Sequence, residues 1–104
     1  MNFKAMILLT RRDDMTHEQY ENWWLNTHVP LAKQLPGLRK AVFNVVQNPQ
    51  EGDPDGITEL WFDSQEAFES AYATEIGKQV VADSLANVSS RRRMHVDEHR
   101  AFGD

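Results

Sequence analysis

The chain has 104 residues, which is the size of one domain and too short for two. It carries 16 acidic and 11 basic side chains, a net charge of −5, and no cysteine. This acidic balance argues against a nucleic-acid or anionic-membrane partner, and the missing thiol excludes disulfides, thiolate metal sites and a cysteine nucleophile. The apolar stretch near the start is too short to span a bilayer and lacks a signal-peptide cleavage site, so we expect a cytoplasmic protein.

A strand and a long helix are predicted for the first third of the chain. Phe3 to Thr10 is an apolar run whose length suits a strand buried on both faces, although periodicity alone also fits a helix. Thr16, followed by Gln19 three residues later, has the spacing of a capping box and predicts that a helix begins there. The apolar arc of this helix contains Tyr20, Trp23, Trp24, Thr27, Leu31 and Leu35.

Pro30 lies inside this helical pattern. Because proline has no N–H for the carbonyl of Asn26 and disfavours helical angles at the residue before it, we predict a kink or a break near His28. The helix is expected to stop at Pro36-Gly37, and a strand rich in β-branched residues is predicted from Leu38 to Gln47.

The middle of the chain reads as a hairpin. Asn48 to Gly56 is rich in proline, glycine and aspartate, so we predict a surface loop there. A third strand is predicted from Ile57 to Asp63, and two strands joined in this way form an antiparallel pair.

The last third is predicted to form a second helix and a fourth strand. Asp63 or Ser64 caps the helix, Gly77 interrupts it, and the apolar period continues from Val80 to Val88. The final strand is predicted from Arg92 to Phe102. We interpret the run of three arginines at 91–93 as the solvated start of that strand rather than as a phosphate site.

The element order β-α-β-β-α-β predicts one ferredoxin-like α+β domain over residues 1–104, with a four-stranded antiparallel sheet. Helices cover only one face of such a sheet. The strands are too apolar to leave the other face in water, so a homodimer that packs face to face is the leading expectation.

Three segments, in this order, resemble the EthD family. They are the aromatic-rich helix with His-Val-Pro-Leu at Tyr20–Leu31 and the Leu-Pro-Gly-Leu-Arg that follows at Leu35–Arg39, then Asp55–Ser64, and then the Glu98-His99 pair near the end. The resemblance covers nearly the whole chain. It implies a dimeric α+β barrel, in which two ferredoxin-like sheets pack against each other.

The resemblance says less about the reaction. Relatives of the EthD family include muconolactone isomerases, methylmuconolactone methylisomerases, fungal polyketide dehydratases and decarboxylases, and cofactor-free oxygenases, so the fold alone does not determine the chemistry. In the methylisomerases a histidine that matches His28 is thought to act with a tyrosine and a cysteine. The approximately matching positions here are Ala41 and Leu60, so that reaction is not expected.

His28 and Glu59 are the first two candidates for catalysis. His28 lies at the edge of the apolar arc, and an ordinary imidazole pKa near 6.5 suits acid–base work at neutral pH; alternatively it satisfies the carbonyl that Pro30 leaves free. Glu59 lies in an apolar strand on the same face as Ile57 and Trp61. Paired with an arginine it would be structural, whereas in a dry cavity its pKa would rise and it could act as a base.

His99 is the third catalytic candidate. His95, Asp97 and His99 alternate, so in the predicted strand they would share one face. They could ligate zinc or iron, but this spacing spreads them over about 13 Å, and a charged edge strand is the preferred interpretation. We therefore predict no metal site, and His99 as a cavity residue that matches the family.

Two functions remain open. The first is a cofactor-independent enzyme of isomerase, dehydratase or oxygenase type, with His28 as proton shuttle, Glu59 or His99 as helper, and a small hydrophobic or aromatic substrate. No nucleotide loop, Schiff-base lysine or metal motif is evident, so no cofactor is predicted. The second is a non-catalytic small-molecule binding protein with the same cavity. The side chains expected to contact the ligand are Trp24, Leu31 and Trp61.

Overall fold

The computed structural model describes residues 2–104, which form one sheet and a layer of helices. In chain order the elements are β1 (Phe3–Arg11), α1 (His17–Trp23), the π-helical turn η1 (Trp24–His28), α2 (Val29–Ala32), β2 (Lys40–Val45), β3 (Gly56–Phe62), α3 (Gln65–Ala73), α4 (Glu75–Asn87) and β4 (Val88–Val96). The predicted β-α-β-β-α-β order is confirmed, with each predicted helix divided into shorter pieces.

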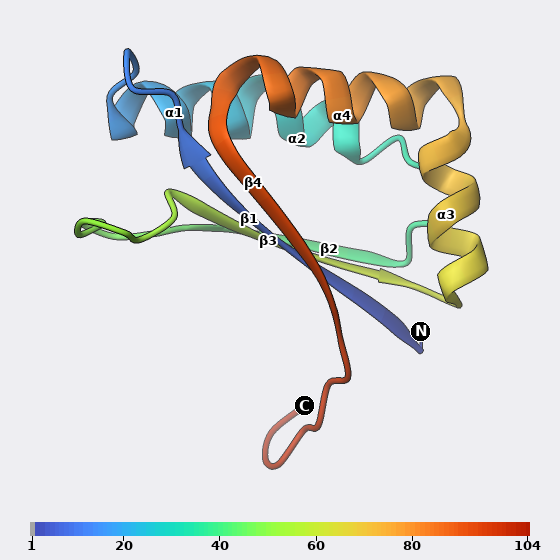
Figure 1. The fold of residues 1–104 in the computed structure, drawn as a ribbon. Coiled ribbons are helices and arrows are strands. Elements are labelled where there is room, and N and C mark those ends of the chain that lie inside the picture. Colours follow the sequence, from blue (N-terminus) through green and yellow to red (C-terminus); the bar gives the residue numbers. More distant parts are fainter. Residues whose placement is uncertain (1) are drawn as a thin grey trace.

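The four strands form one antiparallel sheet in the order β2-β3-β1-β4. The helices gather on one side of it, with α3 at one end, and the C-terminal tail extends away from the opposite side (Figure 1). Residues paired across neighbouring strands point to the same side of a sheet. We call the side away from the helices the open face. It carries the apolar residues Met6, Leu8, Val42, Ile57, Trp61, Met94 and Val96 and the polar or charged residues Lys4, Lys40, Asn44, Glu59 and Arg92.

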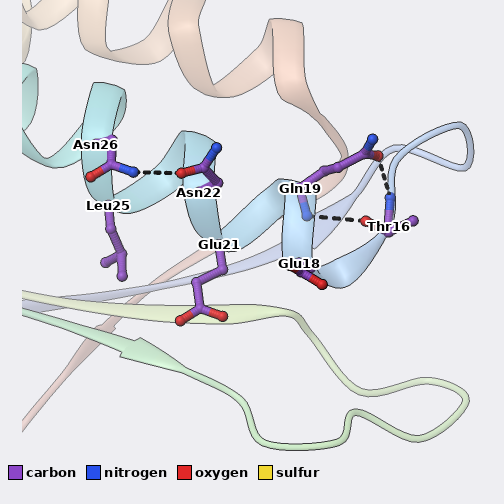
Figure 2. A pocket seen from close by; sticks show the side chains of 7 residues that line it. All are labelled: Thr16, Glu18, Gln19, Glu21, Asn22, Leu25 and Asn26. Atoms are coloured by element: carbon purple, nitrogen blue, oxygen red, sulfur yellow. Dashed lines mark hydrogen bonds between the residues drawn. The ribbon is translucent and has the colours of Figure 1, made fainter.

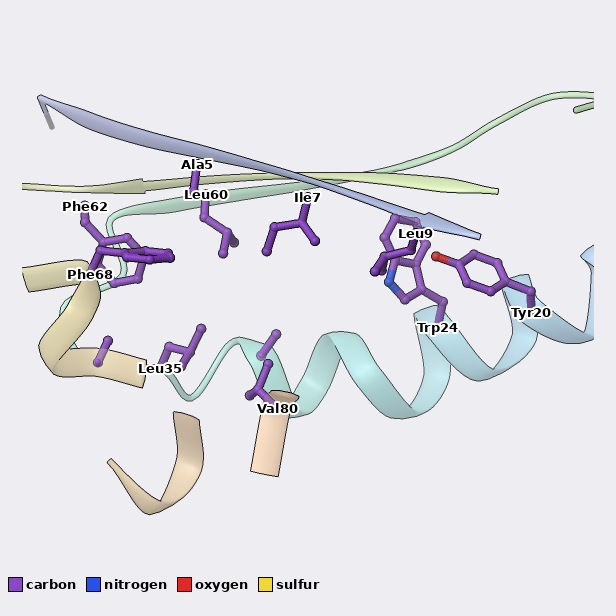
Figure 3. Packing of buried hydrophobic residues seen from close by; sticks show 12 residues of the cluster. Ala5, Ile7, Leu9, Tyr20, Trp24, Leu35, Leu60, Phe62, Phe68 and Val80 are labelled. Atoms are coloured by element: carbon purple, nitrogen blue, oxygen red, sulfur yellow. The ribbon is translucent and has the colours of Figure 1, made fainter. Parts of the chain in front are cut away.

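The core lies between the sheet and the helices (Figure 3). Every second residue of β1 points into it, and its burial pattern shows that alternation. The strand is therefore buried on one side and partly covered on the other, rather than buried on both. The largest side chains that are fully buried in the core are Trp24, Tyr20, Phe62, Phe68, Leu9 and Leu60.

The helix begins where the capping box predicts. Gln19 N–H donates to the Thr16 hydroxyl at 3.0 Å, and Thr16 N–H donates to the Gln19 side chain at 2.8 Å. The predicted interruption near His28 takes the form of the π turn, in which the Val29 N–H bonds to the Trp24 carbonyl. The extra residue in this turn shifts the helical phase. As a result Thr27, predicted to be in the apolar arc, is exposed, and His28 is buried.

The second helix breaks at Thr74 and not at the predicted Gly77. Thr74 has extended angles, and its hydroxyl accepts the Gly77 N–H at 3.1 Å, so it caps α4. Gly77 serves a different purpose. A Cβ at this position would lie 2.5 Å from the Cα of Tyr72, so the glycine lets the first turn of α4 approach the end of α3.

The final strand starts and ends earlier than predicted. It runs from Val88 to Val96 instead of from Arg92 to Phe102, because its register is set by β1. Val96 pairs with Lys4 near the start of β1, so a longer β4 would have no partner strand. The three arginines therefore lie within the strand rather than at its start. The helices of residues 2–104 include none that is long and apolar enough to cross a membrane.

Candidate functional site

The sheet separates the three predicted catalytic residues. His28 comes from η1 and lies between the helices and the sheet, whereas Glu59 is on the open face of β3. His99 follows β4 in the tail. Within one chain, Glu59 and His99 therefore do not share a cavity with His28. The expectation that either assists His28 is not met in a single chain, because alternate residues of a strand point to opposite faces.

His28 forms a buried pair with Asp83. It is only 4% exposed, and its Nδ1 lies 2.9 Å from Oδ2 of Asp83 on α4. The other carboxylate oxygen of Asp83 accepts the Trp23 indole N–H at 3.3 Å. Because a carboxylate only accepts, the His28 proton sits on Nδ1, and Nε2 is the unprotonated, accepting nitrogen. The hydroxyl of Ser84 lies 3.4 Å from that Nε2.

Burial keeps His28 uncharged. Loss of hydration lowers the pKa of His28 below its ordinary value, and the charge of Arg91 lowers it further, against the opposing effect of Asp83. The imidazole is therefore neutral at pH 7. A neutral imidazole with an unprotonated Nε2 and a carboxylate on Nδ1 is arranged to accept a proton, since Asp83 stabilises the imidazolium that would form.

His28 lines a small cavity between the helices and the sheet. Its volume is about 10 Å³, close to the least that holds one water molecule. The wall is mixed, with an apolar part from the sheet and the helices and a polar part near His28. The lining residues are Ile7, Leu9, His28, Ala32, Phe43, Thr58, Leu60, Tyr72, Val80, Ser84 and Arg91.

Sequence reasoning missed Asp83, Ser84 and Arg91 as members of this site. Asp83 and Ser84 lie on α4, and only the packing of α4 beside η1 brings them to His28. The inward direction of Arg91 could have been found from the sequence. Positions 91, 93 and 95 alternate with 92 and 94, so a strand that begins before the arginines sends Arg91 toward one face and Arg92 toward the other.

Glu59 is held by a lysine. Lys4 Nζ lies 2.9 Å from one carboxylate oxygen, and the Asn44 amide donates to the other at 3.0 Å. The hydrogen bond from Lys4 is the main cause that lowers the pKa of Glu59. The partner of Glu59 is therefore Lys4 and not the predicted arginine. The pKa of Glu59 is lowered, whereas a dry cavity would raise it.

Comparison with known proteins identifies the family. The family model described as "EthD domain" matches residues 12–91, which include η1, the hairpin and α4. The chain belongs to the EthD family. A comparison with curated proteins gives no match.

Solved structures resemble this EthD protein along its whole length. An ethyl tert-butyl ether degradation (EthD) family protein from Bacillus halodurans C-125 has a TM-score of 0.79 and 24% identity, covering 95% of this chain and 100% of its own. A dimeric ferredoxin-like protein of unknown function from Thermobifida fusca YX has a TM-score of 0.77 and 14% identity, and the match covers 94% of this chain and 92% of that protein. SnoaB from Streptomyces nogalater, a cofactor-independent oxygenase, has a TM-score of 0.69 and 12% identity, and the match covers 99% of this chain and 98% of SnoaB. These likenesses confirm the ferredoxin-like fold.

His99 and its neighbours in this EthD protein do not form a strand face. His95 packs edge-on against the ring of Phe3, whereas Asp97 and His99 lie beyond the end of β4. His99 lines an open depression of about 330 Å³ at the edge of the open face, together with Lys4 and Trp61 among others. Among residues 2–104, no group of three or more histidine and acidic side chains could hold a metal ion.

The three predicted ligand contacts are also divided. Trp24 is fully buried in the core against Phe43 of β2, and Leu31 is partly buried beside the same core. Trp61 is on the open face, where its ring lies 4.5 Å from Lys4 Nζ and 4.7 Å from Lys40 Nζ. None of the three lines the cavity of His28. Their predicted contacts with a ligand stay predictions.

A wider hollow of the EthD protein lies elsewhere. It is an open depression of about 750 Å³ along the outer side of α1 and η1 (Figure 2). Its walls come from the helical segment and its N-cap alone: Thr16, Glu18, Gln19, Glu21, Asn22, Leu25 and Asn26. Gln19 and Thr16 are occupied by the capping box, and Asn22 accepts from Asn26 at 2.6 Å. We place the candidate site at His28, where a buried imidazole, the Asp83 carboxylate and a cavity lie together.

Proposed function

We propose that this EthD protein is a cofactor-independent acid–base enzyme in which His28 moves a proton on a small hydrophobic or aromatic molecule. Nε2 of His28 takes a proton from the substrate and returns it to another atom. That cycle suits an isomerisation, a dehydration, or the activation of a substrate for oxygen. The observation that carries the proposal is the buried pair of His28 and Asp83 beside the cavity.

The electrostatics support this role. The depressed pKa of His28 keeps the base form populated at neutral pH, and Asp83 stabilises the imidazolium after proton transfer. Two proteins of similar fold are described as enzymes: SnoaB is a cofactor-independent oxygenase, and another is an antibiotic biosynthesis monooxygenase. They support the proposal that this chain is an enzyme as well.

We further propose a homodimer formed through the open face. The face presents apolar side chains from all four strands, among them Met6, Val42, Ile57 and Met94. Two structural neighbours are described as dimeric proteins of ferredoxin-like fold. Glu59 lies on this face and His99 lies beside it. If they take part in catalysis, they would do so in a space between the two copies of the dimer.

The closed cavity favours a second candidate. A volume of about 10 Å³ does not hold an organic molecule, so a substrate must displace side chains to enter. A binding or accessory protein without turnover fits this observation, because it needs the ligand to enter but needs no proton transfer.

Exchange with deuterium separates the two candidates. The protein is incubated in heavy water with small aromatic carbonyl compounds and lactones, and incorporation is followed by NMR. We expect the wild type to exchange an acidic C–H of the compound. The exchange rate should fall about a hundredfold or more in His28→Gln, and it should also fall in Asp83→Asn. Asp13→Asn, at an exposed carboxylate, is the matched control and should keep the rate. Saturable binding with no exchange supports the accessory protein instead.

A further inference from the structure

Arg91 is a charged side chain without a countercharge. It is half-buried, and its Nε lies inside the protein with no hydrogen-bond partner in the described part of the chain. Among residues 2–104, no carboxylate lies within 4.0 Å of its guanidinium. The groups that act on it electrostatically are the Tyr72 hydroxyl and a second cation, Arg93.

Such an arrangement is costly unless something compensates it. Burying an unpaired charge or an unmade N–H hydrogen bond reduces stability by about 1–3 kcal/mol or more. Arg92 and Arg93 avoid that cost because both are exposed. Arg91 and Arg93 are both on the helix-facing side of β4, opposite Leu9 and Ile7, but only Arg91 is half-buried.

The guanidinium borders the cavity that holds the proposed base. Arg91 and His28 line the same space, together with the hydroxyl groups of Thr58, Tyr72 and Ser84. Arginine is the side chain best suited to a planar anion, because Nε–H and one terminal N–H point in parallel and match the two oxygens of a carboxylate. The apolar walls can accept the rest of a small molecule.

We propose that Arg91 binds a carboxylate of the ligand, so that the substrates of the His28 site are small apolar carboxylic acids. This inference rests on the proposed function for its location beside His28. Nε–H, which has no partner in the described chain, donates to one carboxylate oxygen. The neighbouring oxygen takes a terminal N–H, and the apolar part of the acid reaches toward Nε2 of His28.

The same contact would couple binding to basicity. The charged and titratable groups that act on His28 are Asp83 from α4 and Arg91 from β4, and the Tyr72 hydroxyl from the end of α3 lines the same space. Arg91 disfavours the imidazolium, whereas a carboxylate paired with Arg91 cancels that charge. Binding of an acid should therefore raise the pKa of His28.

A ligand would enter where the wall of the cavity is partly exposed, and Arg91 belongs to that part of the wall. Arg91 and Tyr72 are both partly exposed, whereas His28 and Ser84 are buried. Phe43 is the third partly exposed side chain of the lining, so displacement of Arg91 and Tyr72 is one of the ways in which the cavity would open. Because Arg91 is itself part of this wall, a carboxylate that enters in this way meets the guanidinium first.

NMR of the arginine Nε–H groups tests the inference with benzoate as the probe and neutral benzamide as its isostere. We expect benzoate, and not benzamide, to shift the Arg91 Nε–H signal in a saturable way and to raise the pKa of His28. Arg91→Met should weaken benzoate binding about tenfold to a hundredfold, and Arg91→Lys should weaken it less, since it keeps the charge. Arg93→Met, at the exposed neighbour on the same face, is the matched control and should bind as the wild type does.

Several outcomes would overturn the inference. These are no saturable shift with benzoate, equal binding of benzamide, or equal losses in Arg91→Met and Arg93→Met. If Arg91→Met does not fold, a wild-type benzoate affinity in Arg91→Lys together with an unchanged Nε–H signal in the wild type decides against it. Benzoate binding without deuterium exchange would leave this inference standing and remove the acid–base enzyme, so the two can fail separately.

Discussion

At the scale of single residues, environment decides what each titratable group does. His28 and Glu59 were both candidates on sequence grounds, yet burial makes His28 a neutral acceptor while Lys4 holds Glu59 ionised. Asp83 determines the tautomer of His28, since its carboxylate needs the proton on Nδ1. The chemistry of the site therefore comes from the partners of His28 as much as from the imidazole itself.

The stability of the protein should report the depressed pKa of His28. Between its pKa in the fold and the ordinary value of 6.5, the unfolded chain binds more protons than the folded chain. The contribution is complete above pH 6.5 and declines as the pH falls, by at most about 1.4 kcal/mol per pH unit. Urea unfolding between about pH 7 and pH 5.5 should show a steeper loss in the wild type than in His28→Gln. Equal slopes in the two proteins would contradict the depressed pKa.

At the scale of elements, local hydrogen bonds determine where the helices begin. Thr16 with Gln19, Ser64 and Thr74 each accept a backbone N–H from the first turn that follows, at 3.0–3.1 Å. Two irregularities inside the helical layer, the π turn and Gly77, affect how the helices pack and not where they begin. The π turn rotates His28 inward, and Gly77 lets α4 approach α3.

The capping box gives a prediction for the first helix. Thr16→Ala removes one side of the reciprocal hydrogen bonds and should lower the free energy of unfolding by about 1 kcal/mol. Thr27→Ala is the matched control, because Thr27 is exposed in the middle of the same helical segment and alanine has the higher helix propensity. Denaturant unfolding measures both. A loss in Thr27→Ala as large as that in Thr16→Ala would show that the cap is not the cause.

At the scale of the whole molecule, helices on one side leave the open face of the sheet uncovered on the other (Figure 1). Apolar side chains from all four strands lie on that face beside a few charged ones. A domain of 104 residues buries only about two-thirds of its unfolded surface, so covering this face would add stability that one chain lacks. The proposed homodimer would provide that cover. It would also place Glu59 of each copy within the interface.

Light scattering tests the dimer. Met94 is 37% exposed on the open face of the edge strand β4, opposite Met6 of β1. Met94→Asp should therefore weaken association at least about tenfold, because it places a charge among the apolar side chains of the interface. Leu85→Asp is the control, since Leu85 is 61% exposed on α4, on the helical side of the sheet. We expect the wild type and Leu85→Asp at twice the 12.0 kDa of one chain. A wild type that is monomeric at micromolar concentration would end the dimer proposal.

The sequence by itself determined the element order, the first helix start and the family motif around His28. These depend on spacings of a few residues: the capping box at Thr16, the alternation of the strands, and Pro30 after His28. The tertiary structure alone decided the limits of β4, the break at Thr74 and the partners of His28. Pairing with β1 sets the register of β4 and so the inward direction of Arg91, and the packing of α4 beside η1 brings Asp83 to the imidazole. Contacts between segments more than fifty residues apart leave no local pattern, because their geometry depends on how whole elements pack.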